Sequence, residues 1–141
     1  MNKQAIWFIV NPISGGKKVH QSIVELIDNQ LDKQVYLPKV CYTEYAGHAT
    51  EIAADAVKNG VPTVVAIGGD GTVNEVGKAL IHTKTALGII PTGSGNGLAR
   101  ELEIPMKAAK AIESLNTPVS KIIDVCYANE VPFFLYGWNR I

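Results

Sequence analysis

The sequence predicts a three-layer α/β fold, in which helices cover both faces of a mainly parallel sheet. Two observations support this prediction. Apolar runs typical of strands alternate with helical spacing of apolar residues, and glycine-rich segments follow three of the strands. Strict alternation requires right-handed crossovers between parallel strands. The strands' carboxyl ends then meet at one edge, where ligands bind in such folds, so we expect the glycine-rich segments to converge there.

The first elements follow these patterns closely. Residues 6–10 form a continuous apolar run of β-forming side chains. Apolar residues then recur at helical spacing over residues 19–31. Residues 34–42 predict a second strand, and Pro38 favours a place at the sheet edge because proline donates no hydrogen bond to a ladder.

The middle of the chain repeats the alternation. Residues 63–67 are apolar on both faces, as is typical of a central parallel strand. Asn59 and Gly60 are suited to end the helix before it, and Pro105 is suited to end a short helix after the last glycine-rich segment. The predicted strands are residues 63–67 and 86–90, and the predicted helices are residues 49–57, 73–80, 98–102 and 108–115.

The pattern changes near residue 118. Residues 119–128 and 131–135 predict two strands joined by Asn129-Glu130, with no helix between them. A hairpin alone is not a stable domain. We therefore expect residues 1–117 to form an α/β domain and residues 118–141 to begin a second β domain that is cut short.

Composition excludes some classes of protein. The 141 residues include 13 basic and 13 acidic side chains, which argues against a nucleic-acid-binding protein. The two cysteines are far apart, which favours reduced, buried thiols and a cytoplasmic location. The apolar run at residues 5–10 is too short for a signal peptide or a membrane span.

The three glycine-rich segments carry the functional prediction. Phosphate binding requires exposed backbone N–H groups without an obstructing Cβ, preferably at the start of a helix. Neither GxxxxGK[ST] nor GxGxxG is present. The segments are Asn11-Pro12-Ile13-Ser14-Gly15-Gly16-Lys17, Gly68-Gly69-Asp70-Gly71-Thr72-Val73-Asn74-Glu75 and Pro91-Thr92-Gly93-Ser94-Gly95-Asn96-Gly97.

Asp70 is the residue of greatest chemical interest in these segments. An unshielded carboxylate about 4 Å from a phosphate is repelled by roughly 4 kcal/mol per charge pair at intermediate dielectric. Asp70 therefore either shares a Mg²⁺ ion with the phosphates or points toward a hydroxyl group. Lys17 could supply counter-charge, and Glu75 falls where a helix dipole favours an acidic residue.

The three segments, in this order and spacing, resemble the catalytic-domain pattern of diacylglycerol kinases, bacterial lipid kinases and sphingosine kinases. The resemblance extends from Ile6 to about Leu135 and implies an N-terminal domain like that of phosphofructokinases and NAD kinases. Thr43 begins Thr-Glu-Tyr-Ala-Gly-His-Ala, which resembles the family's Thr-x-x-x-Gly-x-Ala. The third segment differs from the family's frequent Gly-Thr-x-Asn-Asp-Phe-Ala and is closer to sphingosine kinases, which leaves the acceptor lipid open.

The resemblance implies phosphoryl transfer from Mg²⁺·ATP to a lipid hydroxyl at the membrane surface. The general base of the family is an aspartate of the second domain, so no catalytic base is assigned in this chain. Asp70 is the candidate Mg²⁺ ligand. The candidate ATP-binding residues are Asn11, Ser14, Gly15, Gly16, Lys17, Thr43, Gly68, Gly69, Asp70, Gly71, Thr72, Asn74, Glu75, Gly93, Ser94 and Asn96.

Two alternatives stay open at this point. Gly-Gly-Asp-Gly-Thr also occurs in NAD kinases, and a shortened chain could be a nucleotide-binding remnant without enzyme activity. Family members usually continue after Phe-Phe with a glycine-rich turn and Phe-Asp, whereas this sequence ends with residues 135–141. We expect the chain to be inactive alone, and its exposed hairpin to favour self-association.

Overall fold

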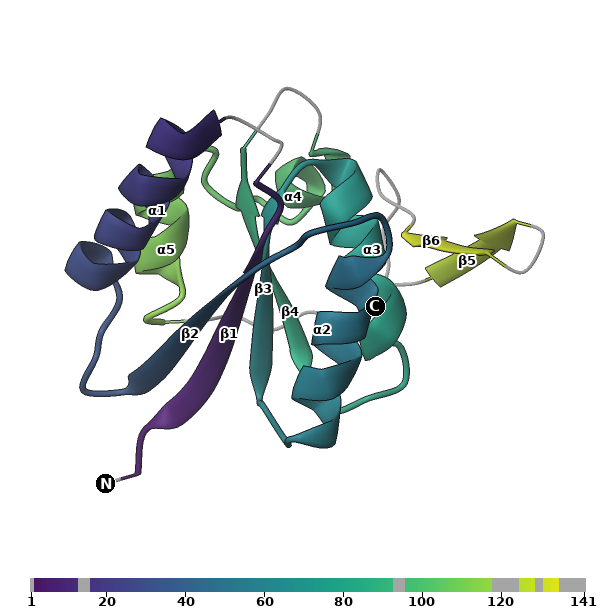
Figure 1. The fold of residues 1–141 in the computed structure, drawn as a ribbon, viewed down its shortest axis with the longest axis horizontal. Helices are drawn as coiled ribbons and strands as arrows, with labels where there is room; N and C mark the ends of the chain where they lie inside the picture. The colour runs from purple at the N-terminus through teal and green to yellow at the C-terminus, as the bar shows by residue number, and fades with distance from the viewer. Residues whose placement is uncertain (1, 13–15, 93–95, 118–124, 129–130, 135–141) are drawn as a thin grey trace.

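The computed structural model describes residues 2–12, 16–92, 96–117, 125–128 and 131–134. They form a four-stranded parallel sheet between two layers of helices, with a separate two-stranded hairpin (Figure 1). The strands are β1 (Gln4–Val10), β2 (Tyr36–Tyr42), β3 (Thr63–Gly68), β4 (Ala86–Pro91), β5 (Val125–Ala128) and β6 (Val131–Phe134). The helices are α1 (Gly16–Gln30), α2 (His48–Lys58), α3 (Asp70–Leu80), α4 (Gly97–Glu101) and α5 (Ala108–Ser114).

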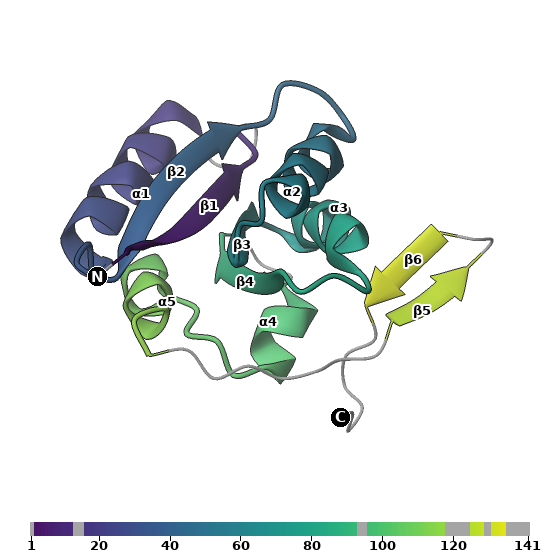
Figure 2. The same cartoon turned by 90° about the horizontal axis from the view of Figure 1, so that it is seen from below.

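The sheet has the strand order β2-β1-β3-β4, and every neighbouring pair in it is parallel. Helices α1 and α5 cover one face, and α2, α3 and α4 lie on the other (Figure 2). The three-layer α/β prediction is therefore confirmed.

Strand β1 shows how the sequence divides its side chains between the two layers. Phe8 and Val10 are buried in one core cluster with Ile27 of α1. Ile9 faces the other way and is buried with Ala53 of α2. This period of two is the pattern of a strand that is covered on both faces.

Strand β2 lies at one edge of the sheet, as Pro38 predicted. The N–H groups at both ends of the β1–β2 ladder fix its register: Gln4 donates to the Val35 carbonyl at 2.8 Å, and Thr43 donates to the Val10 carbonyl at 2.9 Å. The backbone groups of odd-numbered β2 residues therefore bond to β1. The backbone nitrogen of Pro38 points away from β1, so its missing N–H removes no ladder bond. Cys41 is half-buried, not buried as expected, because edge strands are only partly covered.

Some element boundaries differ from the predictions. Strand β2 begins at Tyr36 because the N–H groups of Val35 and Tyr36 bond the Asp32 carbonyl in a turn. Helix α4 ends at Glu101, ahead of the predicted stop at Pro105, and the left-handed backbone of Glu103 follows it.

Two further predicted features lie in the helical connections. Asn59 and Gly60 end α2, as predicted, and Gly60 has a φ of 69°. Helix α3 begins at Asp70, ahead of the predicted start at residue 73, so Gly71 belongs to its first turn. The connection between β3 and α3 is therefore a single residue, Gly69.

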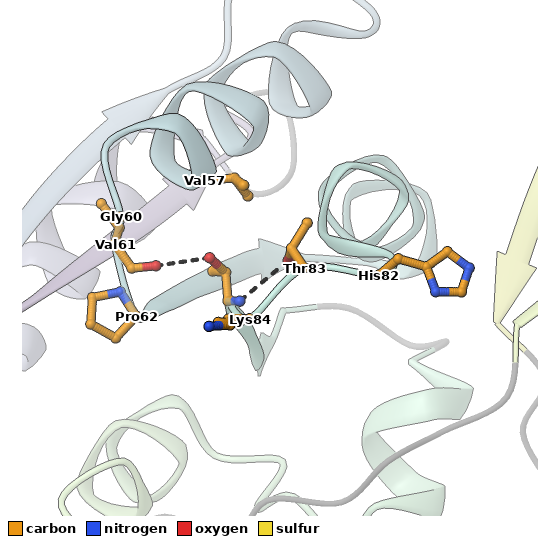
Figure 3. Close-up of a pocket in the computed structure, with 8 residues that line it drawn as sticks. Val57, Gly60, Val61, Pro62, His82, Thr83 and Lys84 are labelled. Carbon is orange, nitrogen blue, oxygen red and sulfur yellow. Dashed lines mark hydrogen bonds between the residues drawn. The ribbon is translucent and has the colours of Figure 1, made fainter.

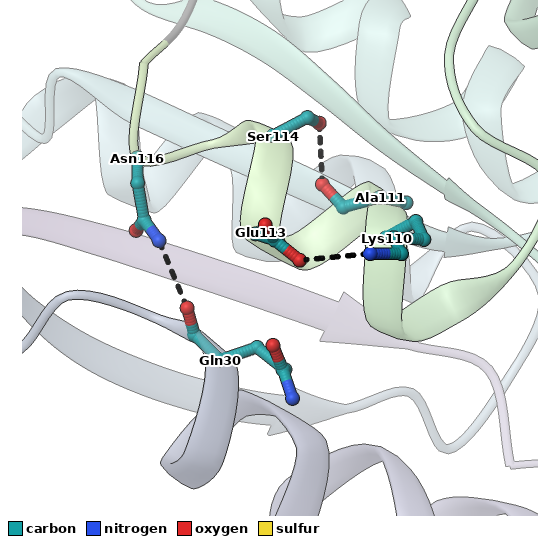
Figure 4. A network of polar contacts seen from close by, with 6 residues as sticks. All are labelled: Gln30, Lys110, Ala111, Glu113, Ser114 and Asn116. Atoms are coloured by element: carbon teal, nitrogen blue, oxygen red, sulfur yellow. Dashed lines mark hydrogen bonds and ion pairs between the residues drawn. The ribbon is translucent and has the colours of Figure 1, made fainter.

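A polar network joins the ends of α1 and α5 (Figure 4). The Asn116 side chain accepts a hydrogen bond from the Asp32 N–H at 2.8 Å and donates one to the Gln30 carbonyl at 2.9 Å. The Tyr36 hydroxyl donates to the Leu115 carbonyl at 2.7 Å. These bonds fix α5 against α1 at the amino edge of the sheet.

The predicted hairpin is present in part. Strands β5 and β6 are antiparallel, and Val125 is paired with Phe134. The remaining residues of the predicted strands, 119–124 and 135, and the predicted turn at residues 129–130 lie outside the described residues.

Candidate functional site

The predicted site begins on a single row across the sheet. Strand pairing aligns Val10 with Tyr42 on one side and with Ile67 on the other, and Ile67 with Ile90. The next residue of each strand therefore stands at the same edge, and these residues are Thr43, Asn11, Gly68 and Pro91. Thr43 and the starts of all three glycine-rich segments converge there, as the sequence predicted.

The sheet also changes winding direction at this row. Strands β1 and β3 are neighbours, but α1 follows β1 onto one face and α3 follows β3 onto the other. The segments after these two strands therefore separate. Ligands of open α/β sheets bind in the crevice at such a point.

The amino end of α3 lies at this edge and offers donors to an anion. The first intrahelical bond is donated by the Val73 N–H to the Gly69 carbonyl at 3.1 Å, so the N–H groups of Gly71 and Thr72 lie ahead of it. Gly69 forms no side-chain cap, being glycine. Beyond the neighbouring residues and the backbone of α3 itself, a Cβ added to Gly69 or Gly71 would meet no described heavy atom within 4 Å. A phosphate group could therefore approach this backbone closely.

Gly68 and Thr72 pack closely against each other where β3 leads into α3. A Cβ on Gly68 would lie 2.7 Å from the Thr72 hydroxyl oxygen and 2.9 Å from its Cβ. Thr72 itself is buried. Among the predicted binding residues, these two thus contribute close packing between β3 and α3.

The Asp70 carboxylate joins the second glycine-rich segment to the third. One oxygen accepts a hydrogen bond from the Asn96 N–H at 3.0 Å, and the other accepts one from the Gly97 N–H at 3.1 Å. The sequence suggested a metal ion or a hydroxyl group as the partner of Asp70, and the structure adds backbone amides. Two N–H dipoles partly compensate the negative charge that would otherwise repel a nearby phosphate.

Glu75 makes a second connection from α3. Its Oε1 accepts a hydrogen bond from the Gly47 N–H at 2.7 Å, and its backbone carbonyl accepts one from the Thr50 hydroxyl at 2.7 Å. Gly47 has a φ of 87° and precedes the first residue of α2. The Glu75 carboxylate therefore holds the β2–α2 connection against α3.

Two aromatic rings lie in this β2–α2 connection. The Tyr45 and His48 rings are stacked, with centroids 4.3 Å apart and planes at 12°. His48 is the first residue of α2, and its Nδ1 accepts a hydrogen bond from the Glu44 N–H at 2.9 Å. The hydrogen bond to Glu51 raises the pKa of Tyr45, whose ring is exposed.

Four other predicted residues lie on or beside helices α1, α3 and α4. Gly16 and Lys17 are the first two residues of α1, Asn74 is half-buried on α3, and Asn96 is buried immediately before α4. Asn96 adopts a left-handed backbone conformation, with φ 60° and ψ 48°. Ser14, Gly15, Gly93 and Ser94 lie outside the described residues.

The part of the chain that the structure describes contains no group of three or more histidine, cysteine, aspartate or glutamate residues that could hold a metal ion. None of its helices is long and apolar enough to cross a membrane.

A shallow depression lies at the opposite edge of the sheet, between the ends of α2 and α3 (Figure 3). Two threonines line it, and both hydroxyl groups already donate hydrogen bonds to the chain. Thr83 donates to the Leu80 carbonyl at 2.7 Å, and Thr85 donates to the Val61 carbonyl at 2.9 Å. These bonds stabilise the α3–β4 connection, and we assign no ligand to the depression.

Known proteins resemble this chain in sequence and in fold. The family model of the diacylglycerol kinase catalytic domain matches residues 5–128. A diacylglycerol kinase of Bacillus subtilis is 33% identical over 137 residues, covering 94% of this chain and 45% of that protein. A Streptococcus pneumoniae protein named as a candidate lipid kinase is 36% identical over 124 residues, covering 86% of this chain and 42% of that protein.

A crystal structure of a diacylglycerol kinase from Bacillus anthracis has the same fold, with a TM-score of 0.76 at 26% identity. The match covers 94% of this chain and 45% of that one. The chain belongs to the diacylglycerol kinase catalytic-domain family, a family of lipid kinases. It spans less than half the length of these relatives.

Proposed function

We propose that this chain is the nucleotide-binding half of an ATP-dependent lipid kinase, which transfers the γ-phosphoryl group of ATP to a lipid hydroxyl. The observation that carries the proposal is the amino end of α3. Its backbone donors and the open space over Gly69 and Gly71 lie at the point where the sheet changes winding direction.

The residues of this edge fit Mg²⁺·ATP. The N–H groups of Gly71 and Thr72 would bind phosphate oxygens, and Asn11 and Thr43 lie one and two strands away on the same row. Mg²⁺ is commonly held by one or two carboxylates together with substrate phosphates, so Asp70 alone could supply the protein ligand. Bound Mg²⁺·ATP supplies the transferable phosphoryl group, and the chain's part is to position it and neutralise charge.

The proposal also covers the organisation of the enzyme. Residues 1–117 form the nucleotide-binding domain, and residues 118–141 begin a second domain that supplies the general base and completes the lipid site. The enzyme works at a membrane surface, because its acceptor is a lipid. The chain alone is then expected to bind ATP without phosphorylating diacylglycerol, which a radiolabel-transfer assay would check.

The direct test is the unfolding temperature of this chain with Mg²⁺·ATP or with NAD. A ligand at 100 times its dissociation constant adds about 2.7 kcal/mol of stability. Stabilisation by ATP alone supports the proposal. Stabilisation by NAD alone favours an NAD kinase-like enzyme, which shares Gly-Gly-Asp-Gly-Thr. A chain that responds to neither would contradict the proposed site.

A further inference from the structure

We propose that Asp70 and Glu75 are positioning residues, whose carboxylates hold the connections on either side of α3 in the geometry that binds the nucleotide. The inference rests on the proposed function. It assigns to these two side chains a contact with the protein's own backbone, which for Asp70 is additional to the Mg²⁺ contact proposed above.

The Asp70 contact replaces bonds that α4 cannot make for itself. The first bond within α4 is donated by the Arg100 N–H to the Asn96 carbonyl at 3.0 Å. The N–H groups of Asn96 and Gly97 lie ahead of it and therefore lack a helical carbonyl. Both are bonded to the Asp70 carboxylate, at 3.0 Å and 3.1 Å. A carboxylate at the start of a helix also complements its dipole.

The Glu75 carboxylate likewise accepts from a backbone N–H at the start of α2. The Thr50 N–H donates to the Gly47 carbonyl at 3.1 Å, so the Gly47 N–H lies ahead of the first turn of α2. That N–H is bonded to the Glu75 carboxylate at 2.7 Å. The connection that contains Thr43 and Tyr45 is thereby held against α3.

The spacing of the two residues explains how one helix reaches both neighbours. Residues five apart on an α-helix point in directions about 140° apart, since 3.6 residues complete a turn. Helices α2 and α4 lie on different sides of α3 (Figure 2). The two carboxylates therefore fix two separate connections. Because these connections are already ordered, less conformational entropy is lost when a ligand binds between them.

Backbone amide hydrogen exchange tests each contact without a ligand. In Asp70→Asn, whose side-chain nitrogen cannot accept a hydrogen bond, we expect the Asn96 or the Gly97 amide to exchange at least tenfold faster, equivalent to about 1.4 kcal/mol, while Gly47 stays within twofold of the wild type. In Glu75→Ala, which leaves no acceptor for the Gly47 N–H, we expect the reverse. The Gln4 amide, which is bonded to the Val35 carbonyl at the opposite edge of the sheet, is the control in both variants.

Unchanged exchange at these amides would overturn the corresponding contact. The wild-type protein gives a check that needs no variant: the Asn96 and Gly97 amides must exchange more slowly than the Gly71 amide, which lies ahead of the first α3 bond. Equal rates would contradict the inference even if Asp70→Asn failed to fold.

ATP affinity, measured by calorimetry with and without Mg²⁺, separates positioning from metal binding. Positioning predicts that Asp70→Asn weakens ATP binding about five- to tenfold in both conditions, since the lost contact is within the protein. Weakening only with Mg²⁺ would make Asp70 a metal ligand and overturn its positioning role. A wild-type chain that binds no ATP would overturn the proposed function, whereas the exchange result would still decide whether the two contacts exist.

Discussion

The Thr72 hydroxyl oxygen lies 2.7 Å from the position that a Cβ on Gly68 would occupy. This distance is shorter than a carbon and an oxygen atom can tolerate without contact strain. Thr72 is buried in the first turn of α3, and its branched side chain has little freedom to move. The close approach of β3 and α3 at the candidate site therefore requires glycine at position 68.

Gly68→Ala is expected to destabilise the protein. The added methyl group must displace Thr72 or the start of α3, and such overpacking costs about 1–3 kcal/mol. Urea denaturation of the wild type and the variant measures the loss. An unchanged free energy of unfolding would show that the turn adjusts freely.

Gly71→Ala is the matched substitution with the opposite expectation. A Cβ at position 71 meets no described atom within 4 Å, and alanine in a helix is more favourable than glycine by about 0.5–1 kcal/mol. Stability should therefore hold or rise, while ATP affinity falls because the methyl group blocks the phosphate's approach. Calorimetric ATP binding to both glycine variants is the measurement, and wild-type affinity in Gly71→Ala would contradict the phosphate site.

Asn116→Ala should weaken the attachment of α5 to α1. The substitution removes the bonds to the Asp32 N–H and the Gln30 carbonyl, for a cost of about 1–2 kcal/mol. Lys110→Ala is the control in the same region, because its 3.6 Å ion pair with Glu113 is solvent-exposed and such pairs contribute about 0–0.5 kcal/mol. Urea denaturation measures both losses. Equal destabilisation in the two variants would contradict the larger contribution expected from the Asn116 hydrogen bonds.

Stability should fall at high pH in part because of Tyr36. Burial, and to a smaller extent the nearby Asp32 carboxylate, raises the pKa of this phenol above its ordinary value of 10.0. As pH rises through that value, the unfolded chain releases its proton before the folded chain does, so the free energy of unfolding decreases. Tyr36→Phe removes this contribution, and its stability should depend less on pH above pH 10.

The same variant loses the hydrogen bond to the Leu115 carbonyl, which lowers its stability by about 0.5–1.5 kcal/mol at all lower pH values. Denaturation curves from pH 8 to pH 11 separate this constant loss from the change in slope. Parallel curves for the two proteins would show that Tyr36 keeps its ordinary pKa.

Cys41 should react slowly with thiol reagents at neutral pH. Burial raises the pKa of its thiol, against the opposing effect of Lys39, so little reactive thiolate is present. We expect Cys126→Ser protein to react more slowly than free cysteine at pH 8 and to reach the free rate in urea. A folded protein that reacts as fast as free cysteine would contradict the raised pKa of the Cys41 thiol.

The sequence was sufficient to predict the layers of the fold and the edge that carries the candidate site. Apolar periodicity separates Phe8 from Ile9, which face opposite layers, and the glycine-rich segments after three strands had to meet because parallel strands end at one edge. The edge position of β2 followed from Pro38. These features depend on local pattern and on the rules of chain connection.

The contacts of Asp70 and Glu75 could not be predicted in the same way. Each carboxylate bonds a backbone N–H that is more than twenty residues away, and every residue except proline carries such a group. Residue type therefore gives no signal for these partners. Only the packing of α2 and α4 beside α3 decides which N–H groups come within reach.

Pro38 also bears on how this protein behaves at high concentration. The outward edge of β2 is a row of backbone donors and acceptors against which a strand of another molecule could align. Proline interrupts that row at its middle, and an incoming strand would find no hydrogen to accept there. We therefore expect Pro38 to weaken pairing with a second molecule along this edge, while the β1–β2 ladder keeps all of its hydrogen bonds.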